Sequence, residues 1–113
     1  MRLQIELEQG AARPGAPVTG TVVVLDGGRA RRMTAWLEFI ERAGKLSAIA
    51  RSEPPSTLAE GDLETDQVLR FELPLPADAL PPLTTEVGEL RWDLVVAVDR
   101  PQFPDLTERA PLA

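Results

Sequence analysis

The chain has 113 residues and a mass of 12.3 kDa, which suits one compact domain over 1–113. It contains no Cys and no His, so thiol catalysis, Cys-ligated zinc, His metal sites and Ser-His-Asp triads are excluded. Eighteen acidic residues against 12 basic ones give a formal charge of −6, and a surface of that sign repels nucleic-acid phosphates. We therefore expect no nucleic-acid partner and no cofactor.

The first segment alternates apolar with polar residues, as a half-buried strand does: Leu3, Ile5 and Leu7 against Gln4, Glu6 and Glu8. That alternation leaves no apolar core for a signal peptide. No apolar run in the chain approaches the roughly 20 residues that a membrane-spanning helix needs. These features predict a cytoplasmic protein without an integral membrane segment.

Eleven prolines and eight glycines divide the rest of the chain into short pieces, which favours strands joined by turns. After a loop over 10–17, the β-branched run 18–25 predicts a strand that ends at the turn signal 26–28. We expect further strands over 46–51, 67–75, 90–99 and 107–112, with mostly loop over 52–66 and a long irregular connection over 76–88. About seven strands with frequent turns are typical of an all-β, immunoglobulin-like antiparallel sandwich.

The segment 30–43 fits two patterns. Helical spacing joins Met33, Trp36, Leu37 and Ile40. Strand alternation joins Met33, Ala35, Leu37 and Phe39. Its place between strong strand signals favours the strand, in which Leu37 points inward and Trp36 points outward.

Several motifs resemble the arrestin family. The turn 14–15 (PG) with the run 18–22 (VTGTV) is similar to the family's proline-glycine turn and "V-x-G-x-V" strand. The stretch 71–82 (FELPLPADALPP) is similar to its "F-x-L-x-L-P-x-x-L-P-P-S" stretch. The motifs occur in the family's order and cover most of the chain.

The C-terminal third carries the same resemblance. The run 88–94 (GELRWDL) is similar to the family's "G-x-L-x-Y-x-L" strand, with Trp92 in the aromatic position. The segment 98–101 (VDRP), with 105–106 (DL) after it, resembles the "V-D-x-P…D" turn that follows.

The family includes animal arrestins, the arrestin-fold subunit of retromer, fungal adaptors and bacterial sporulation-control proteins. The resemblance implies an immunoglobulin-like β-sandwich, of which family members usually have two in tandem, and a non-enzymatic adaptor that binds other proteins. This chain is long enough for one lobe only, and no residues match the receptor-phosphate sensors of animal arrestins. We therefore expect a protein-binding scaffold of bacterial type, completed either by a protein partner or by a homodimer through a sheet edge.

Trp36 is the candidate partner contact, because Trp is enriched at binding hot spots and an outward Trp in a small sandwich is available to a partner. Trp92 lies on an apolar face and is expected in the core. A small-ligand or carbohydrate-binding module is the alternative function, although five aromatic residues in total offer little for a sugar platform.

The remaining polar clusters have simpler structural explanations. The carboxylates Asp99 and Asp105 around a proline turn resemble cation ligands, yet Asp residues commonly cap such turns. Other clusters are expected to be solvated surface groups: the cations Arg29, Arg31 and Arg32; the acidic loop with Glu60, Asp62, Glu64 and Asp66; the pairs Glu38 with Glu41 and Glu86 with Glu89; and Ser47 near Lys45. None of them comes with a signal for a catalytic cleft, and we expect no enzyme and no metal site.

Overall fold

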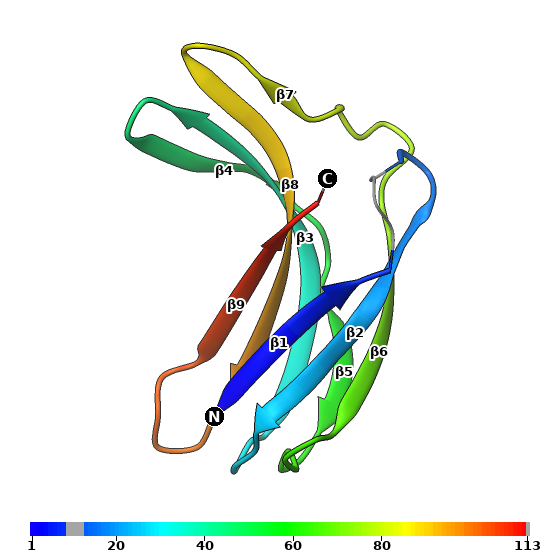
Figure 1. Cartoon of the computed structure of the whole chain (residues 1–113), viewed down its shortest axis with the longest axis vertical. Helices are drawn as coiled ribbons and strands as arrows, with labels where there is room; N and C mark the ends of the chain where they lie inside the picture. The colour runs from blue at the N-terminus through cyan, green and yellow to red at the C-terminus, as the bar shows by residue number, and fades with distance from the viewer. Residues whose placement is uncertain (9–12, 113) are drawn as a thin grey trace.

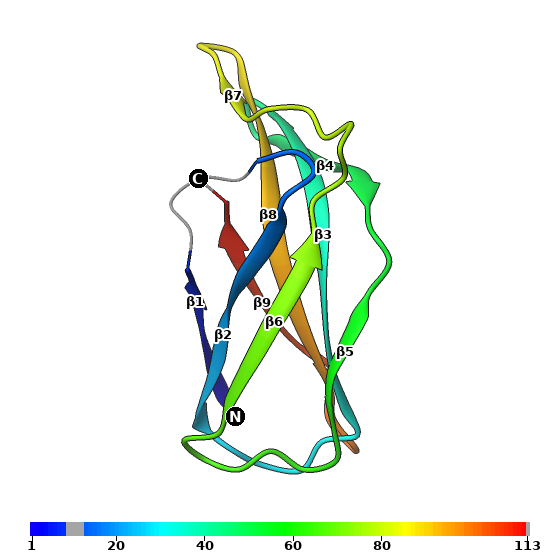
Figure 2. The same cartoon turned by 90° about the vertical axis from the view of Figure 1, so that its right-hand side faces the viewer.

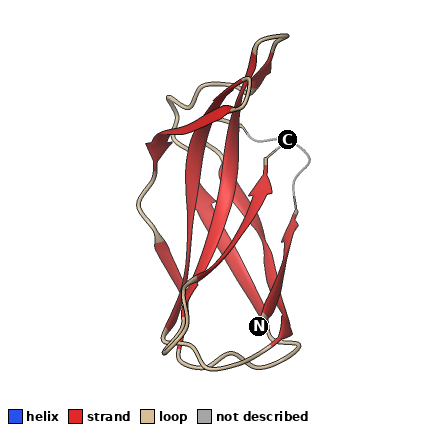
Figure 3. Ribbon diagram, turned by 90° about the vertical axis from the view of Figure 1, so that its left-hand side faces the viewer, coloured by secondary structure: helices blue, strands red, loops and turns tan. Residues whose placement is uncertain are grey.

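The computed structural model describes residues 1–8 and 13–112, so the first part of the expected loop over 10–17 lies outside the described residues. These residues form strands and turns without a helix (Figure 3). The strands are β1 (Arg2–Leu7), β2 (Pro17–Asp26), β3 (Arg32–Ala43), β4 (Leu46–Ser52), β5 (Ser56–Glu60), β6 (Val68–Pro74), β7 (Leu83–Thr84), β8 (Gly88–Asp99) and β9 (Leu106–Pro111). None of the described segments is a helix with the length and apolar character to cross a membrane.

The strands form two antiparallel sheets that pack face to face (Figures 1 and 2). The small sheet has the order β1-β2-β6. In the large sheet β3 and β8 pair along their whole length, from Arg32 opposite Asp99 to Ala43 opposite Gly88. Strands β4 and β5 pair with successive parts of β3, and β7 and β9 pair with successive parts of β8. The expected all-β, immunoglobulin-like antiparallel sandwich is confirmed.

The core lies between the sheets, and strand alternation explains its membership. The large sheet contributes Met33, Ala35, Leu37, Phe39, Trp92, Leu94, Val96 and Val98. The small sheet contributes Leu3, Val18, Val22, Val24, Phe71 and Leu73. Trp92 packs against Phe39 with ring centroids 5.1 Å apart, and its indole nitrogen donates to the carbonyl of Leu80 at 3.1 Å.

The ambiguous segment 30–43 is a strand for most of its length, and the helical alternative is wrong. The strand register satisfies its backbone on both sides, by β8 on one and by β4 and β5 on the other. The expectation of mostly loop over 52–66 is wrong over Ser56–Glu60, which forms β5. This short strand follows two prolines and shows little alternation, and its pairing with β3 comes from tertiary structure.

Both hairpins at one end of the large sheet extend past the small sheet. Figure 1 shows the β3–β4 and β7–β8 hairpins continuing beyond β1, β2 and β6 at the top of the view. At that end the face of the large sheet that elsewhere forms the core has no opposing strand. This projecting end defines the first candidate site.

Candidate functional site

The projecting end holds a hollow of about 510 Å³ between the two hairpins. The core face of the large sheet continues into the projecting end. Side chains two residues apart on a strand share a face, so Glu41 lies on the same face as Phe39, and Leu90 lies on the same face as Trp92. Strand pairing sets Ala43 beside both Leu46 and Gly88. The hollow is therefore a continuation of the core face that the small sheet leaves uncovered.

The lining of this hollow is mainly apolar and well exposed. Leu46 is 79% exposed, Val87 is 81% exposed and Leu83 is 53% exposed. Ala43, Ala48 and Leu90 add to the apolar lining. Scattered apolar side chains on a surface need no explanation, but a group gathered in one hollow marks a site for a partner or ligand.

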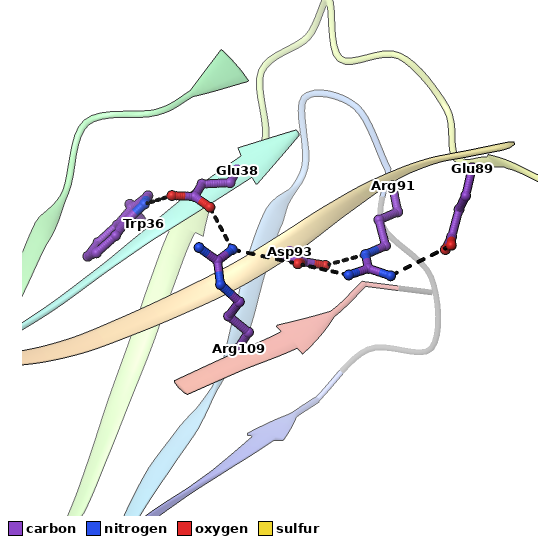
Figure 4. A network of polar contacts seen from close by, with 6 residues as sticks. All are labelled: Trp36, Glu38, Glu89, Arg91, Asp93 and Arg109. Carbon is purple, nitrogen blue, oxygen red and sulfur yellow. Dashed lines mark hydrogen bonds and ion pairs between the residues drawn. The ribbon is translucent and has the colours of Figure 1, made fainter. Parts of the chain in front are cut away.

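A polar network occupies the opposite, outer face of the large sheet (Figure 4). Glu38 and Asp93 are 5% and 2% exposed, and they lie directly opposite each other on β3 and β8. The guanidinium of Arg109, on β9, lies 2.6 Å from Glu38 Oε1 and 3.8 Å from Asp93 Oδ2. One cation thus bridges two carboxylates that would otherwise repel each other across the strand pair.

The network extends to both sides of this bridge. Arg91 donates from Nε to Asp93 Oδ1 at 3.0 Å, and its other end lies 3.6 Å from Glu89. Trp36 donates its indole N–H to Glu38 Oε2 at 2.7 Å. Every buried side-chain polar atom among the described residues has a hydrogen-bond partner. Because both buried carboxylates are satisfied, this network holds β3, β8 and β9 in register.

Trp36 therefore lies on the outer face, as the strand assignment predicts, and is half-buried beside Glu38. Its indole N–H is hydrogen-bonded within the network, and the exposed part of the ring is accessible to a partner. Its role as a partner contact stays a prediction. Trp92 is 1% exposed and belongs to the core, as expected.

Two of the other sequence candidates, Asp99 and Asp62, make hydrogen bonds that join segments distant in the sequence. Asp99 accepts a hydrogen bond from Arg31 at 3.1 Å, and Asp62 accepts one from the backbone N–H of Ala30 at 3.0 Å. Within the described residues, no three acidic side chains come together in a way that could hold a metal ion. Glu41, Lys45 and Ser47 all lie in or next to the β3–β4 hairpin.

One arginine at the end of β4 has a perturbed titration. Arg51 donates to Asp78 at 3.1 Å and to Glu53 at 3.3 Å. The hydrogen bond with Asp78 is the main cause that raises the pKa of the Arg51 guanidinium above its usual value, with Glu53 adding to it. The side chain is therefore a permanent cation that ties the end of β4 to the connection after β6.

No protein-family model matches the sequence, and no curated protein matches it. The chain is similar in structure to Spo0M, a sporulation control protein from Bacillus subtilis, with a TM-score of 0.73 and 18% sequence identity over 98% of this chain. The fold is that of an arrestin-like lobe. The match spans 47% of the Spo0M chain, so this chain corresponds to about half of that protein.

The sequence predicted the outward position of Trp36, but it indicated neither the hollow nor the network. Leu83 and Val87 lie in the proline-containing connection 76–88, where no alternation of apolar and polar residues indicates which side chains share a surface. Arg109 meets Glu38 across 71 positions of sequence, and Asp93 joins them from a third strand. Such a contact depends on the order of strands in the sheet, which alternation within a strand does not specify.

Proposed function

We propose that this chain is a non-enzymatic module that binds another polypeptide, and that the hollow between the projecting hairpins is its main contact surface. The observation that carries the proposal is the exposed apolar lining formed by Leu46, Leu83 and Val87. A protein interface needs a compact apolar centre with a polar rim. Glu41, Arg42 and Glu89 supply such a rim around the hollow.

The residue composition supports a binding role over a catalytic one, and we place this role in the cytoplasm. The chain carries neither His nor Cys, which removes the imidazole base and the thiol nucleophile. Spo0M is described as a sporulation control protein, and its shared fold suggests a regulatory rather than a catalytic task for this chain. The partner is either a different protein or a second copy of the chain paired through a sheet edge.

The test is affinity capture from the native host's lysate, read by mass spectrometry, with three baits. The wild-type chain is compared with the double variant Leu46→Ser, Val87→Ser in the hollow and with Trp36→Ala on the outer face. We expect a protein that the wild type enriches and the hollow variant loses. If the hollow variant retains every partner while Trp36→Ala loses one, the contact surface is the outer face instead. Absence of any enriched protein contradicts the proposal.

A small-ligand or carbohydrate-binding module is the second candidate, favoured by the volume of the hollow, which is of the size that small ligands occupy. The described residues that line it include no aromatic ring for a sugar to stack on. A thermal-shift screen with glycans and metabolites separates the two functions. A ligand that raises the Tm of the wild type but not of the hollow variant supports this alternative.

A further inference from the structure

We propose that the free edge of β4 pairs with the β4 edge of a second copy of this chain, so that two large sheets join into one continuous antiparallel sheet. The inference builds on the proposed function, because it takes the chain to be a binding module, and it names the edge that a homodimer would use.

The other edges carry features that discourage pairing. Charged residues and proline interrupt β6 at Arg70, Glu72 and Pro74, and they interrupt β9 at Glu108 and Pro111. Charges of this kind, and proline, are common devices that keep an edge strand from adding a neighbour. Strand β7 has only two residues, which is too short to template a partner.

The remaining side edges lie against each other across the sandwich. Strand β1 lies beside β9, and β5 lies beside β6, so the sides of the sandwich are partly closed. Figure 2 shows β5 running along the side of the molecule near β6. Strand β4 is different, because it lies on the projecting end, beyond the small sheet (Figure 1).

Strand β4 is the least protected edge. It pairs only with β3, and five consecutive residues, Leu46 to Ala50, carry no charge and no proline. All five are exposed, with Ile49 at 55%. An exposed, uncharged edge of this length is a template for strand addition. The bulge after Ile49 bends the end of the strand and leaves Leu46 to Ile49 as its straight part.

Charge favours a second copy as the occupant. A two-fold axis perpendicular to the sheet pairs the two β4 strands antiparallel, so the start of each meets the end of the other. The start carries Lys45, which makes no ion pair within the described part of the chain. At the other end of β4, Arg51 forms ion pairs with Glu53 and Asp78, and these three side chains together have a net charge of −1. The same pairing extends each hollow across the axis, because Leu46 and Ala48 line it.

A cysteine scan tests the pairing directly, because the chain has no cysteine of its own. A two-fold axis perpendicular to the sheet lies between the two β4 strands and leaves each face of the sheet unchanged. Facing residues therefore share a face, and one residue of β4 lies directly opposite its own copy across the axis. Single substitutions Ser47→Cys, Ala48→Cys and Ile49→Cys are each oxidised mildly in the purified protein. We expect one of the three to form a disulfide-linked dimer and Val68→Cys, exposed on the edge strand β6, to form none.

Sedimentation velocity over a range of concentrations provides the second readout. We expect a concentration-dependent dimer whose dissociation constant rises at least about tenfold in Ala48→Lys, because the two lysines face each other near the axis. Val68→Lys should leave the dimer unchanged. A monomer at all concentrations, a dimer that Ala48→Lys does not weaken, or cross-linking equal to Val68→Cys overturns the inference. Because no other protein is present, these failures leave the capture experiment on the hollow unaffected.

Discussion

Glu38 and Asp93 face each other across the β3–β8 pair as two buried carboxylates, and the guanidinium of Arg109 lies between them. Two like charges directly opposite on neighbouring strands destabilise a sheet unless a cation compensates them. Arg109 comes from β9, so a cation shared by both carboxylates is present only when the three strands have assembled in the correct order. Arg91 pairs with Asp93 from β8 itself, but Arg109 is the cation that contacts both carboxylates.

Replacing Arg109 tests this dependence. Arg109→Ala leaves two buried carboxylates without their shared cation, and we expect a loss of about 3 kcal/mol in the free energy of unfolding. Urea denaturation at neutral pH measures it. Adding Glu38→Gln to Arg109→Ala should recover part of the loss, because a neutral amide no longer repels Asp93.

The matched control is Arg70→Ala. Arg70 pairs with Glu8 at 3.0 Å, but its side chain is 72% exposed. An exposed ion pair contributes less than about 1 kcal/mol. Equal losses for Arg70→Ala and Arg109→Ala would show that the outer-face network has no special structural role.

The two tryptophans should respond differently to truncation. Trp92→Ala removes a fully buried side chain together with its packing on Phe39, and we expect a loss of about 3–5 kcal/mol. Trp36→Ala removes a half-buried ring and one hydrogen bond to Glu38, and we expect about 1–2 kcal/mol. Thermal and urea unfolding compare the two. A Trp36→Ala protein as unstable as Trp92→Ala would assign Trp36 to the core.

The sequence allowed the sandwich to be predicted because alternation identifies strands and their inner faces. Leu90 to Asp99 shows it most clearly, with Trp92 and Val98 pointing into the core as expected. Segment 30–43 stayed ambiguous because Met33 and Leu37 satisfy both helical and strand spacing, and the pairing of β3 with β8 resolves it. The network around Arg109 was out of reach, because no local pattern pairs β3 with β8, places Glu38 opposite Asp93 or sets Arg109 beside both.

Gly88 maintains the close approach of the two projecting hairpins. A Cβ at this position would collide with the backbone carbonyl of Arg42 on the facing strand. Gly88→Ala should therefore separate β8 from β3 at the hollow and cost about 2 kcal/mol. Gly28→Ala is the control, since its Cβ would meet only the flexible end of Met1 at 3.4 Å. Chemical denaturation of both variants measures the difference, and equal stabilities would contradict the role of Gly88.

The apolar lining of the hollow should contribute little to folding. Leu46 and Val87 are both well-exposed surface residues. We therefore expect the free energy of unfolding of the double variant Leu46→Ser, Val87→Ser to lie within about 0.5 kcal/mol of the wild-type value. Leu37→Ser, which places a hydroxyl at a core position 1% exposed, is expected to lose several times as much. Differential scanning calorimetry compares the three proteins. If the double variant is strongly destabilised, Leu46 and Val87 serve the fold itself, and any loss of partner binding in that variant would follow from unfolding. If its stability is unchanged, their exposure is not required for folding, and a lost partner reports on the surface that they form.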